Sequence, residues 1–280
     1  MERELIVECE RITGTRLDMD RLREVLDYTN RMAAAWKRVL ELNRGRPALF
    51  NALVDGTVYL GVLNALRGTR EGAEYFERLV EEMEYKAAHR LGTIQDEKYR
   101  LLFVGVPCYP IFRRFHEMFA DQGGVIVASS YPWCAAGGLD LGFQHDLTRP
   151  IESLAEGVLV GVRHAGDAML FHDQSLIEQV DQFGADGIVY HPVKSCRTVS
   201  TSLAGSRKAV MKARDIQCLF IESDMMDRRV VSEAQLKNRI DAFFEGLATR
   251  KRQSAIAATS AMPASAATTP GAATSTSAGA

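Results

Sequence analysis

The chain has 280 residues, of which 46% are hydrophobic and 25% charged, and its formal net charge is −2. These values are typical of a soluble globular protein with one large domain or two small ones. They argue against a nucleic-acid partner, which calls for a basic stripe, and no apolar stretch reaches the roughly 18 residues needed to cross a membrane. The acidic first residues, including Glu2 and Glu4, do not resemble a secretory signal. We therefore expect a cytoplasmic protein with no nucleic-acid or membrane partner.

Residues 1–97 have the pattern of a helical segment. Apolar residues between Leu22 and Leu40 recur at steps of three and four, which places them on one face of a helix. Asp18 or Asp20 can cap the start of this helix, and the Gly-Arg-Pro run at 45–47 ends it. Two further helices are predicted at 48–66 and 70–91.

Residues 98–247 predict a doubly wound α/β domain with a mostly parallel sheet. Four continuous apolar runs are typical of strands covered on both faces, and they lie at 101–106, 125–128, 187–190 and 218–221. Helical patterns alternate with them at 111–121, 167–183, 202–213 and 233–247. The order of the strands stays open.

Residues 248–280 predict a disordered tail. From Ser254 onward almost every residue is Ala, Ser, Thr, Pro or Gly. Such a composition buries too little apolar surface to offset the entropy lost on ordering.

Five cysteines are scattered along the chain without a Cys-x-x-Cys pair: Cys9, Cys108, Cys134, Cys196 and Cys218. Their spacing excludes a self-contained zinc ribbon or ferredoxin motif and predicts thiols or metal ligands in place of a disulfide framework. The second, third and fourth of them follow predicted strands, at the sheet edge where open α/β domains bind ligands. The first and the last are expected to be small core residues.

Cys196 has the most suggestive surroundings. Lys194 and Arg197 flank it and a predicted helix follows, and both features favour a thiolate. The spacing alone leaves open whether this thiol is a ligand or an inert loop cysteine. His191, at the end of the third predicted strand, could hydrogen-bond in the same crevice or serve the packing alone. The pattern assigns no catalytic or substrate-binding residue.

Three segments resemble the 2-hydroxyacyl-CoA dehydratase D-component family: 190–200 (YHPVKSCRTVS), 219–224 (LFIESD) and 232–243 (SEAQLKNRIDAF). The resemblance covers about residues 1–247, and within the family it is strongest to the B-subunit type of ATP-dependent benzoyl-CoA reductase. It implies a subunit that pairs as a heterodimer with a homologous iron–sulfur subunit, each holding a [4Fe-4S] cluster near an acyl-CoA substrate. Electrons would come from ferredoxin through ATP-hydrolysing activator subunits, so that ATP is not bound by this chain.

The reductase branch of the family reduces the aromatic ring of benzoyl-CoA to a cyclic diene. The resemblance therefore implies an oxidoreductase subunit and matches Cys196 to a cysteine ligand of the cluster. The family's N-terminal domain, which gives further cysteine ligands, has no counterpart in this sequence, so we expect the remaining ligands outside the chain and no activity of the chain alone. Cys108 and Cys134 are possible substitute ligands because both lie at the same predicted edge of the sheet.

Two alternatives to the reductase stay open from the sequence. The first is a 2-hydroxyacyl-CoA dehydratase subunit, which removes water from its substrate by radical chemistry. The second is a non-catalytic module that only pairs with other subunits.

Overall fold

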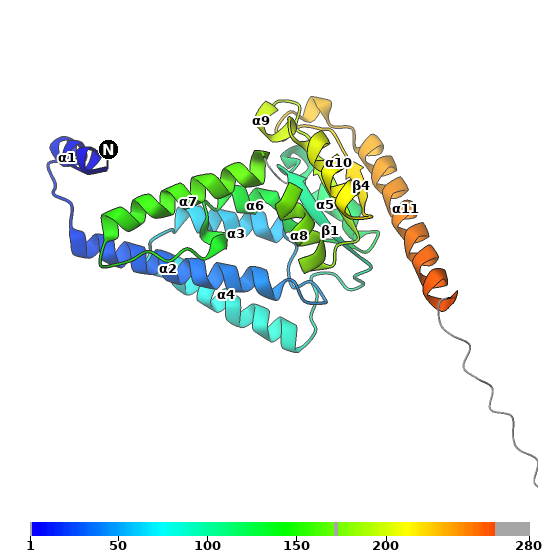
Figure 1. The fold of residues 1–280 in the computed structure, drawn as a ribbon, viewed down its shortest axis with the longest axis horizontal. Coiled ribbons are helices and arrows are strands. Elements are labelled where there is room, and N and C mark those ends of the chain that lie inside the picture. The colour runs from blue at the N-terminus through cyan, green and yellow to red at the C-terminus, as the bar shows by residue number, and fades with distance from the viewer. Residues whose placement is uncertain (1, 171–172, 261–280) are drawn as a thin grey trace, which may run out of the picture.

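The computed structural model describes residues 2–170 and 173–260. A group of long helices lies beside a parallel sheet that has helices on both of its faces (Figure 1). In chain order the elements are α1 (Glu2–Thr13), α2 (Met19–Leu42), α3 (Val54–Ala65), α4 (Arg70–Ala88), β1 (Tyr99–Gly105), η1 (Tyr109–Ile111), α5 (Phe112–Ala120), β2 (Gly124–Ser129), α6 (Ser130–Ala135), η2 (Leu139–Leu141), α7 (Pro150–Leu170), α8 (Asp173–Phe183), β3 (Gly187–His191), α9 (Arg197–Ser200), α10 (Leu203–Ala213), β4 (Gln217–Phe220), η3 (Arg228–Val230) and α11 (Glu233–Ser260).

The sheet has four strands in the order β2-β1-β3-β4, and every pairing is parallel. Each strand coincides with one of the apolar runs found in the sequence. The α/β class and the parallel sheet are therefore confirmed, and the structure adds the strand order that the sequence left open.

Alternate residues of the strands face two separate cores, as the two-residue period of a strand requires. Phe103 of β1 packs in a core that also holds Phe115 of α5 and residues of α11 and the long helices. Its neighbour Leu102 faces the opposite core, with Val210 of α10 and residues of α8. Because both faces are covered, the strands can be apolar throughout.

The long helices pack mainly through α2 and α4. Asp18 accepts hydrogen bonds from the backbone N–H groups of Asp20 and Arg21, so Asp18 is the cap of α2. Trp36 of α2 is fully buried, and its ring centroid lies 5.7 Å from that of Phe76 in α4. The apolar stripe predicted from the sequence is thus the buried face of α2.

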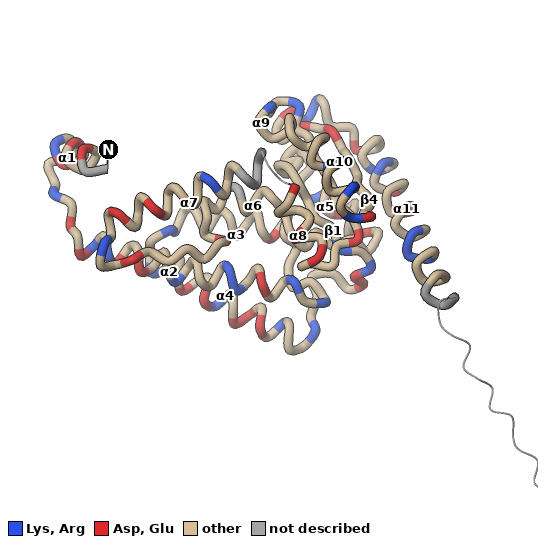
Figure 2. The backbone as a smooth tube through the Cα atoms, in the orientation of Figure 1, with Lys and Arg blue, Asp and Glu red and all other residues tan. Residues whose placement is uncertain are grey.

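Ion pairs join the same two helices at their surface. Arg31 of α2 lies 2.8 Å from the carboxylate of Glu77, and Arg38 lies 2.9 Å from that of Glu84. Figure 2 shows acidic and basic residues interspersed along α2 and α4. Because these side chains are partly exposed, each pair contributes at most about 1 kcal/mol. The buried aromatic contacts therefore hold the two helices together more strongly than the ion pairs do.

Arg100 of β1 joins the long helices to the sheet. Its side chain is fully buried and donates hydrogen bonds to the carbonyl oxygens of Asn43, Gly45 and Phe183. Glu97 supplies the counter-charge at 2.9 Å. A buried guanidinium is stable only when its donors are used in this way. The turn after α2 is therefore fixed against the start of β1, at the end of the sheet away from the cysteines.

The helix predicted at 167–183 is wrong in its extent. Residues there belong to the end of α7 and to α8, and α7 begins much earlier, at Pro150. The apolar residues of α7 do not form one buried stripe, since Val158, Leu159 and Val162 are between 57% and 71% exposed. Leu154, Val158 and Val162 nevertheless recur at four-residue steps, so the first half of α7 carried a helical signal that our prediction missed.

The predicted start of the tail at residue 248 is also wrong, because α11 continues to Ser260. Alanine has the highest helix propensity, and extending an existing helix carries no nucleation cost. The rest of the predicted tail, 261–280, lies outside the described residues.

Within the described ranges, none of the helices combines the length and apolar character of a membrane span.

Candidate functional site

The strand order places a topological switch point at the carboxyl edge of the sheet. β2 lies on one side of β1, and from β2 the chain crosses over to β3 on the other side of β1. The connections that leave β1 and β3 therefore run in opposite directions, and the switch point lies between these two strands. Open α/β sheets bind ligands at such a point of divergence. The segments that follow β1 and β3 contain Cys108 and Cys196, and the candidate site is built from these two segments and the one that follows β4 (Figure 1).

Gly105 lets the β1 and β3 segments approach closely. Its φ is +127°, and a Cβ atom there would lie 2.4 Å from the carbonyl oxygen of His191. Its N–H group donates to Ser130 Oγ at 3.1 Å. Only glycine fits this conformation and this contact without strain.

His191 is fully buried between these segments. Its Nδ1 lies 2.6 Å from the carbonyl oxygen of Val106 and its Nε2 lies 2.5 Å from Ser223 Oγ. Burial lowers the pKa of His191, so the ring is neutral near pH 7. Because a carbonyl can only accept, Nδ1 carries the proton and Nε2 accepts from the serine hydroxyl. Both ring nitrogen atoms are used, and His191 serves to join the β1, β3 and β4 segments.

Cys108 belongs to the same buried network. It is fully buried, and its Sγ atom lies 3.6 Å from Ser223 Oγ. Burial raises the pKa of its thiol, which favours the neutral form over the thiolate that binds metal. The structure therefore places Cys108 at the predicted sheet edge as an interior thiol.

The loop that contains Cys196 is fixed by hydrogen bonds from both sides. Lys194 N–H donates to the carbonyl oxygen of Ser223 at 3.0 Å, and Ser195 N–H donates to Asp224 Oδ2 at 2.8 Å. At the other end of the loop, Ser200 Oγ accepts from the N–H of Val193 at 2.9 Å. These bonds hold the backbone of residues 193–196 in one conformation.

Asp224 is the centre of this arrangement. It is 2% exposed, and besides Ser195 it accepts from the N–H groups of Met226 and Asp227, both through Oδ1. The N–H groups of Asp227, Met226 and Ser195 hold the pKa of Asp224 well below its usual range. A carboxylate with this many charge-assisted hydrogen bonds is a rigid anchor. From the sequence we assigned no role to Ser223 and Asp224, although the polar run at 222–224, soon after an apolar strand, was a signal for them.

Cys196 itself is a free thiol that is partly exposed. It directly precedes α9, a single turn of four residues, and the longer helix α10 begins only at Leu203. Lys194, which we expected to support a thiolate, forms an exposed ion pair at 3.5 Å with the carboxylate of Glu222. The features that distinguish Cys196 are its accessibility and its fixed loop.

The described residues fit one sulfur ligand for a cluster and not a complete ligand set. Within 2–170 and 173–260, no group of three or more His, Cys, Asp or Glu side chains is arranged to hold a metal ion. A [4Fe-4S] cluster takes four cysteine ligands in its ordinary form. Cys134 lies in α6, and its side chain is outside what the structure describes. Two cysteines were expected in the core. Cys218 of β4 is partly buried and packs against it. Cys9 of α1 is exposed, so the expectation for Cys9 is wrong.

Comparison with known proteins agrees with the resemblance found in the sequence. Residues 2–247 match the family model described as 2-hydroxyglutaryl-CoA dehydratase, D-component. The B subunit of benzoyl-CoA reductase from Thauera aromatica is 33% identical over 267 residues, which are 92% of this chain and 61% of that protein. The (R)-phenyllactyl-CoA dehydratase alpha subunit of Clostridium sporogenes is 25% identical over 249 residues, 88% of this chain and 58% of that protein.

A third relative is the alpha subunit of (R)-2-hydroxyglutaryl-CoA dehydratase from Acidaminococcus fermentans, 25% identical over 247 residues, or 86% of this chain and 48% of that protein. The chain thus spans about half to three fifths of the length of these relatives. Each of the three is a subunit of an enzyme that is named for a coenzyme A thioester. Because the family model matches residues 2–247, which are most of this chain, the chain belongs to the 2-hydroxyglutaryl-CoA dehydratase D-component family.

Proposed function

We propose that the chain is part of an iron–sulfur subunit of a benzoyl-CoA reductase and that Cys196 is one thiolate ligand of a [4Fe-4S] cluster. The identity of 33% to the reductase subunit, against 25% to the two dehydratase subunits over alignments of similar length, favours the reductase. The reaction would be the ATP-driven, ferredoxin-dependent reduction of the aromatic ring of benzoyl-CoA to a cyclic dienoyl-CoA.

The observation that carries the proposal is the placement of Cys196. It is an accessible thiol on a loop with a fixed backbone, at the sheet edge where this type of fold binds ligands. A ligand held by a rigid loop keeps its geometry when it binds. When bound, an iron–sulfur cluster supplies transfer of single electrons at a potential that its surroundings tune. The part of this chain is to hold the sulfur in place through Asp224, Ser200 and the backbone of Ser223.

The remaining ligands and the electron supply would come from outside this chain. The relatives are longer and are named as subunits of larger enzymes. We therefore propose a heteromer with a homologous iron–sulfur subunit, with ATP-hydrolysing activator subunits and with ferredoxin as the electron source. The acyl-CoA substrate would bind near the cluster, and ATP would bind to the activator.

The test compares two cysteine variants in the complete gene product, purified anaerobically with its partner subunits. Cys196→Ser is expected to lower the iron and sulfide content and to change the electron paramagnetic resonance spectrum of the cluster. Cys9→Ser, which alters an exposed thiol on α1, is the matched control and should leave both unchanged. Equal cluster content and equal spectra in the two variants would show that Cys196 is not a ligand.

The dehydratase alternative is supported by the two relatives of that activity, which cover 88% and 86% of this chain. Supplying the reduced complex with benzoyl-CoA and, separately, with a 2-hydroxyacyl-CoA distinguishes the two reactions. Ring reduction supports our proposal, and loss of water from the hydroxy acid in its absence supports the dehydratase. A colourless complex that is stable in air and turns over neither substrate would favour a non-catalytic pairing module.

A further inference from the structure

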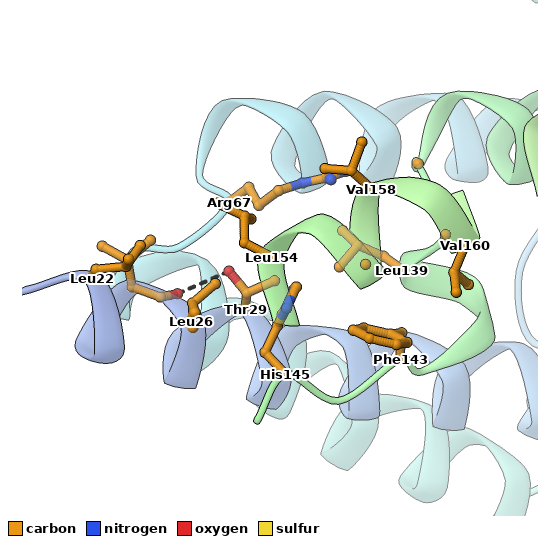
Figure 3. A pocket seen from close by; sticks show the side chains of 14 residues that line it. Leu22, Leu26, Thr29, Arg67, Leu139, Phe143, His145, Leu154, Val158 and Val160 are labelled. Carbon is orange, nitrogen blue, oxygen red and sulfur yellow. Dashed lines mark hydrogen bonds between the residues drawn. The ribbon is translucent and has the colours of Figure 1, made fainter. Parts of the chain in front are cut away.

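A separate hollow of about 310 Å³ lies among the long helices, between the first half of α2 and the first half of α7 (Figure 3). The loop that contains η2 forms a third wall. Most of the lining is apolar and comes from Leu22, Leu26, Leu139, Phe143, Leu154 and Val158. Neither Cys196 nor any residue of its loop lines this pocket.

The pocket is built from fixed parts. Asn30 of α2 holds the loop at His145 by two hydrogen bonds, from Asn30 Nδ2 to the carbonyl oxygen at 2.9 Å and from the N–H to Asn30 Oδ1 at 2.6 Å. Gly157 of α7 lies against the same loop, and a Cβ atom there would come within 2.6 Å of the His145 ring and 3.1 Å of the Phe143 ring. Because the loop is tied to α2 and seated on α7, the side chains cannot simply collapse into the space.

A cation faces this apolar space. Arg67 runs along the wall of the pocket opposite Phe143 and His145 (Figure 3). One of its nitrogen atoms donates to the carbonyl oxygen of Ala136 at 2.5 Å, and none of the described carboxylates forms an ion pair with it. Arg67 as a whole is exposed, and partial burial of its side chain against the pocket wall lowers its pKa. A guanidinium has five N–H donors, so several remain for a ligand.

We propose that this pocket binds a small apolar monocarboxylate, such as an aromatic or branched-chain acid, with its carboxylate on Arg67 and its hydrocarbon part among the leucine side chains. A volume of about 310 Å³ suits a ligand of this size. A carboxylate matches the fork of a guanidinium and would neutralise its charge. A nucleotide or intact coenzyme A carries several phosphate charges, for which a single arginine is not sufficient. Binding of such an acid would depend neither on an iron–sulfur cluster nor on the reductase reaction.

The test measures binding of three probes to the full gene product by calorimetry and by the nuclear magnetic resonance signal of the His145 ring. Benzoate should bind in a saturable way and shift that signal. Benzyl alcohol, which has the ring without the charge, should bind more weakly, and acetate, which has the charge without the ring, should not bind measurably.

Variants locate the site. Arg67→Gln should weaken benzoate by about tenfold or more and leave benzyl alcohol nearly unchanged, because only the charge-assisted bonds are lost. Val158→Phe should weaken both, since Val158 lines the mouth and is 57% exposed, so the larger ring can be accommodated without unfolding. Arg70→Gln is the matched control, because this arginine on α4 is exposed and does not line the pocket.

Three results would overturn the proposal. The first is the absence of saturable benzoate binding to protein that is folded by circular dichroism. The second is benzoate binding that leaves the His145 signal unshifted, and the third is equal benzoate affinity in the Arg67→Gln and Arg70→Gln variants. If Arg67→Gln does not fold, Val158→Phe decides alone, since unchanged benzoate affinity in that variant contradicts the assignment.

Discussion

Asp224 allows a sharp test of how the Cys196 loop is held. Replacing it by asparagine keeps the size of the side chain but turns one acceptor oxygen into an NH₂ donor. If the amide oxygen takes the place of Oδ1, it still accepts from Met226 and Asp227, and the NH₂ group then faces the N–H of Ser195. Whichever way the amide is turned, at least one of these part-buried N–H groups loses its acceptor.

The magnitude follows from that single bond. A hydrogen bond to a charged acceptor contributes about 1.5–3 kcal/mol. We therefore expect Asp224→Asn to lower the free energy of unfolding by about 2–3 kcal/mol. Amide hydrogen exchange at Ser195 should accelerate by about ten- to a hundredfold, since 1.4 kcal/mol corresponds to a factor of ten. Asp227→Asn is the control, because this neighbouring aspartate bonds mainly to Arg229 at the surface.

The effect of Asp224 should also depend on pH. Its pKa is lower in the folded chain than the value of about 3.9 in an unfolded chain. The ionised carboxylate therefore stabilises the fold fully above about pH 4, and this contribution is lost as the pH falls toward the folded pKa. The difference in unfolding free energy between wild type and Asp224→Asn should shrink below about pH 4. If Asp224→Asn and Asp227→Asn are equally stable at pH 7 and Ser195 exchanges at the same rate in both, the anchoring role is refuted.

Three further predictions concern other parts of the molecule. Gly105→Ala should lower the free energy of unfolding by about 1–3 kcal/mol, because its positive φ and the facing carbonyl oxygen leave no room for a Cβ atom. Lys251→Ala should lower the free energy of unfolding by about 1 kcal/mol, because Lys251 pairs with the carboxylate of Asp186 and lies over the ring of Tyr99. The loss is small because the Lys251 side chain is partly exposed. In cluster-free protein, mass spectrometry should find Cys196 alkylated by iodoacetamide well before Cys108, whose burial raises the pKa of its thiol.

Each of these predictions has a control in the same chain. Gly205→Ala lies in α10 with open space around its Cα, so it should leave stability unchanged or raise it by up to about 1 kcal/mol. Arg252→Ala, one residue beyond Lys251, removes a contact to Thr249 on the outside of α11 and should change little. Cys9 should be alkylated as readily as Cys196, because it is exposed. Loss of stability in Gly205→Ala equal to that in Gly105→Ala, or alkylation of Cys108 first, would contradict the reasoning.

The sheet was the most predictable part of the fold. Strands buried on both faces need apolar residues at every position, and runs such as 101–106 have no other common explanation in an α/β pattern. The cap at Asp18 and the stripe of α2 followed from equally local rules. The strand order could not be predicted, since it depends on contacts between segments far apart in sequence, such as Gly105 with His191.

The candidate site was predictable only in part. The position of Cys196 after a strand indicated the sheet edge, but its accessibility and the burial of Cys108 depend on how three loops meet. The roles of Ser223 and Asp224 depend on the same meeting of loops. The pocket at Arg67 was not predicted at all, because it depends on how α7 packs against α2, which lies more than a hundred residues earlier.

The most direct test of the central claim is whether the sulfur position of Cys196 is bonded to iron. Incorporating selenocysteine at residue 196 of the complete gene product, purified anaerobically with its partner subunits, gives a unique absorber for X-ray absorption spectroscopy. We predict an iron atom directly bonded to the selenium, lost when the cluster is removed by a chelator. A spectrum that shows only the bonded carbon in the intact complex would contradict the assignment of Cys196 as a cluster ligand.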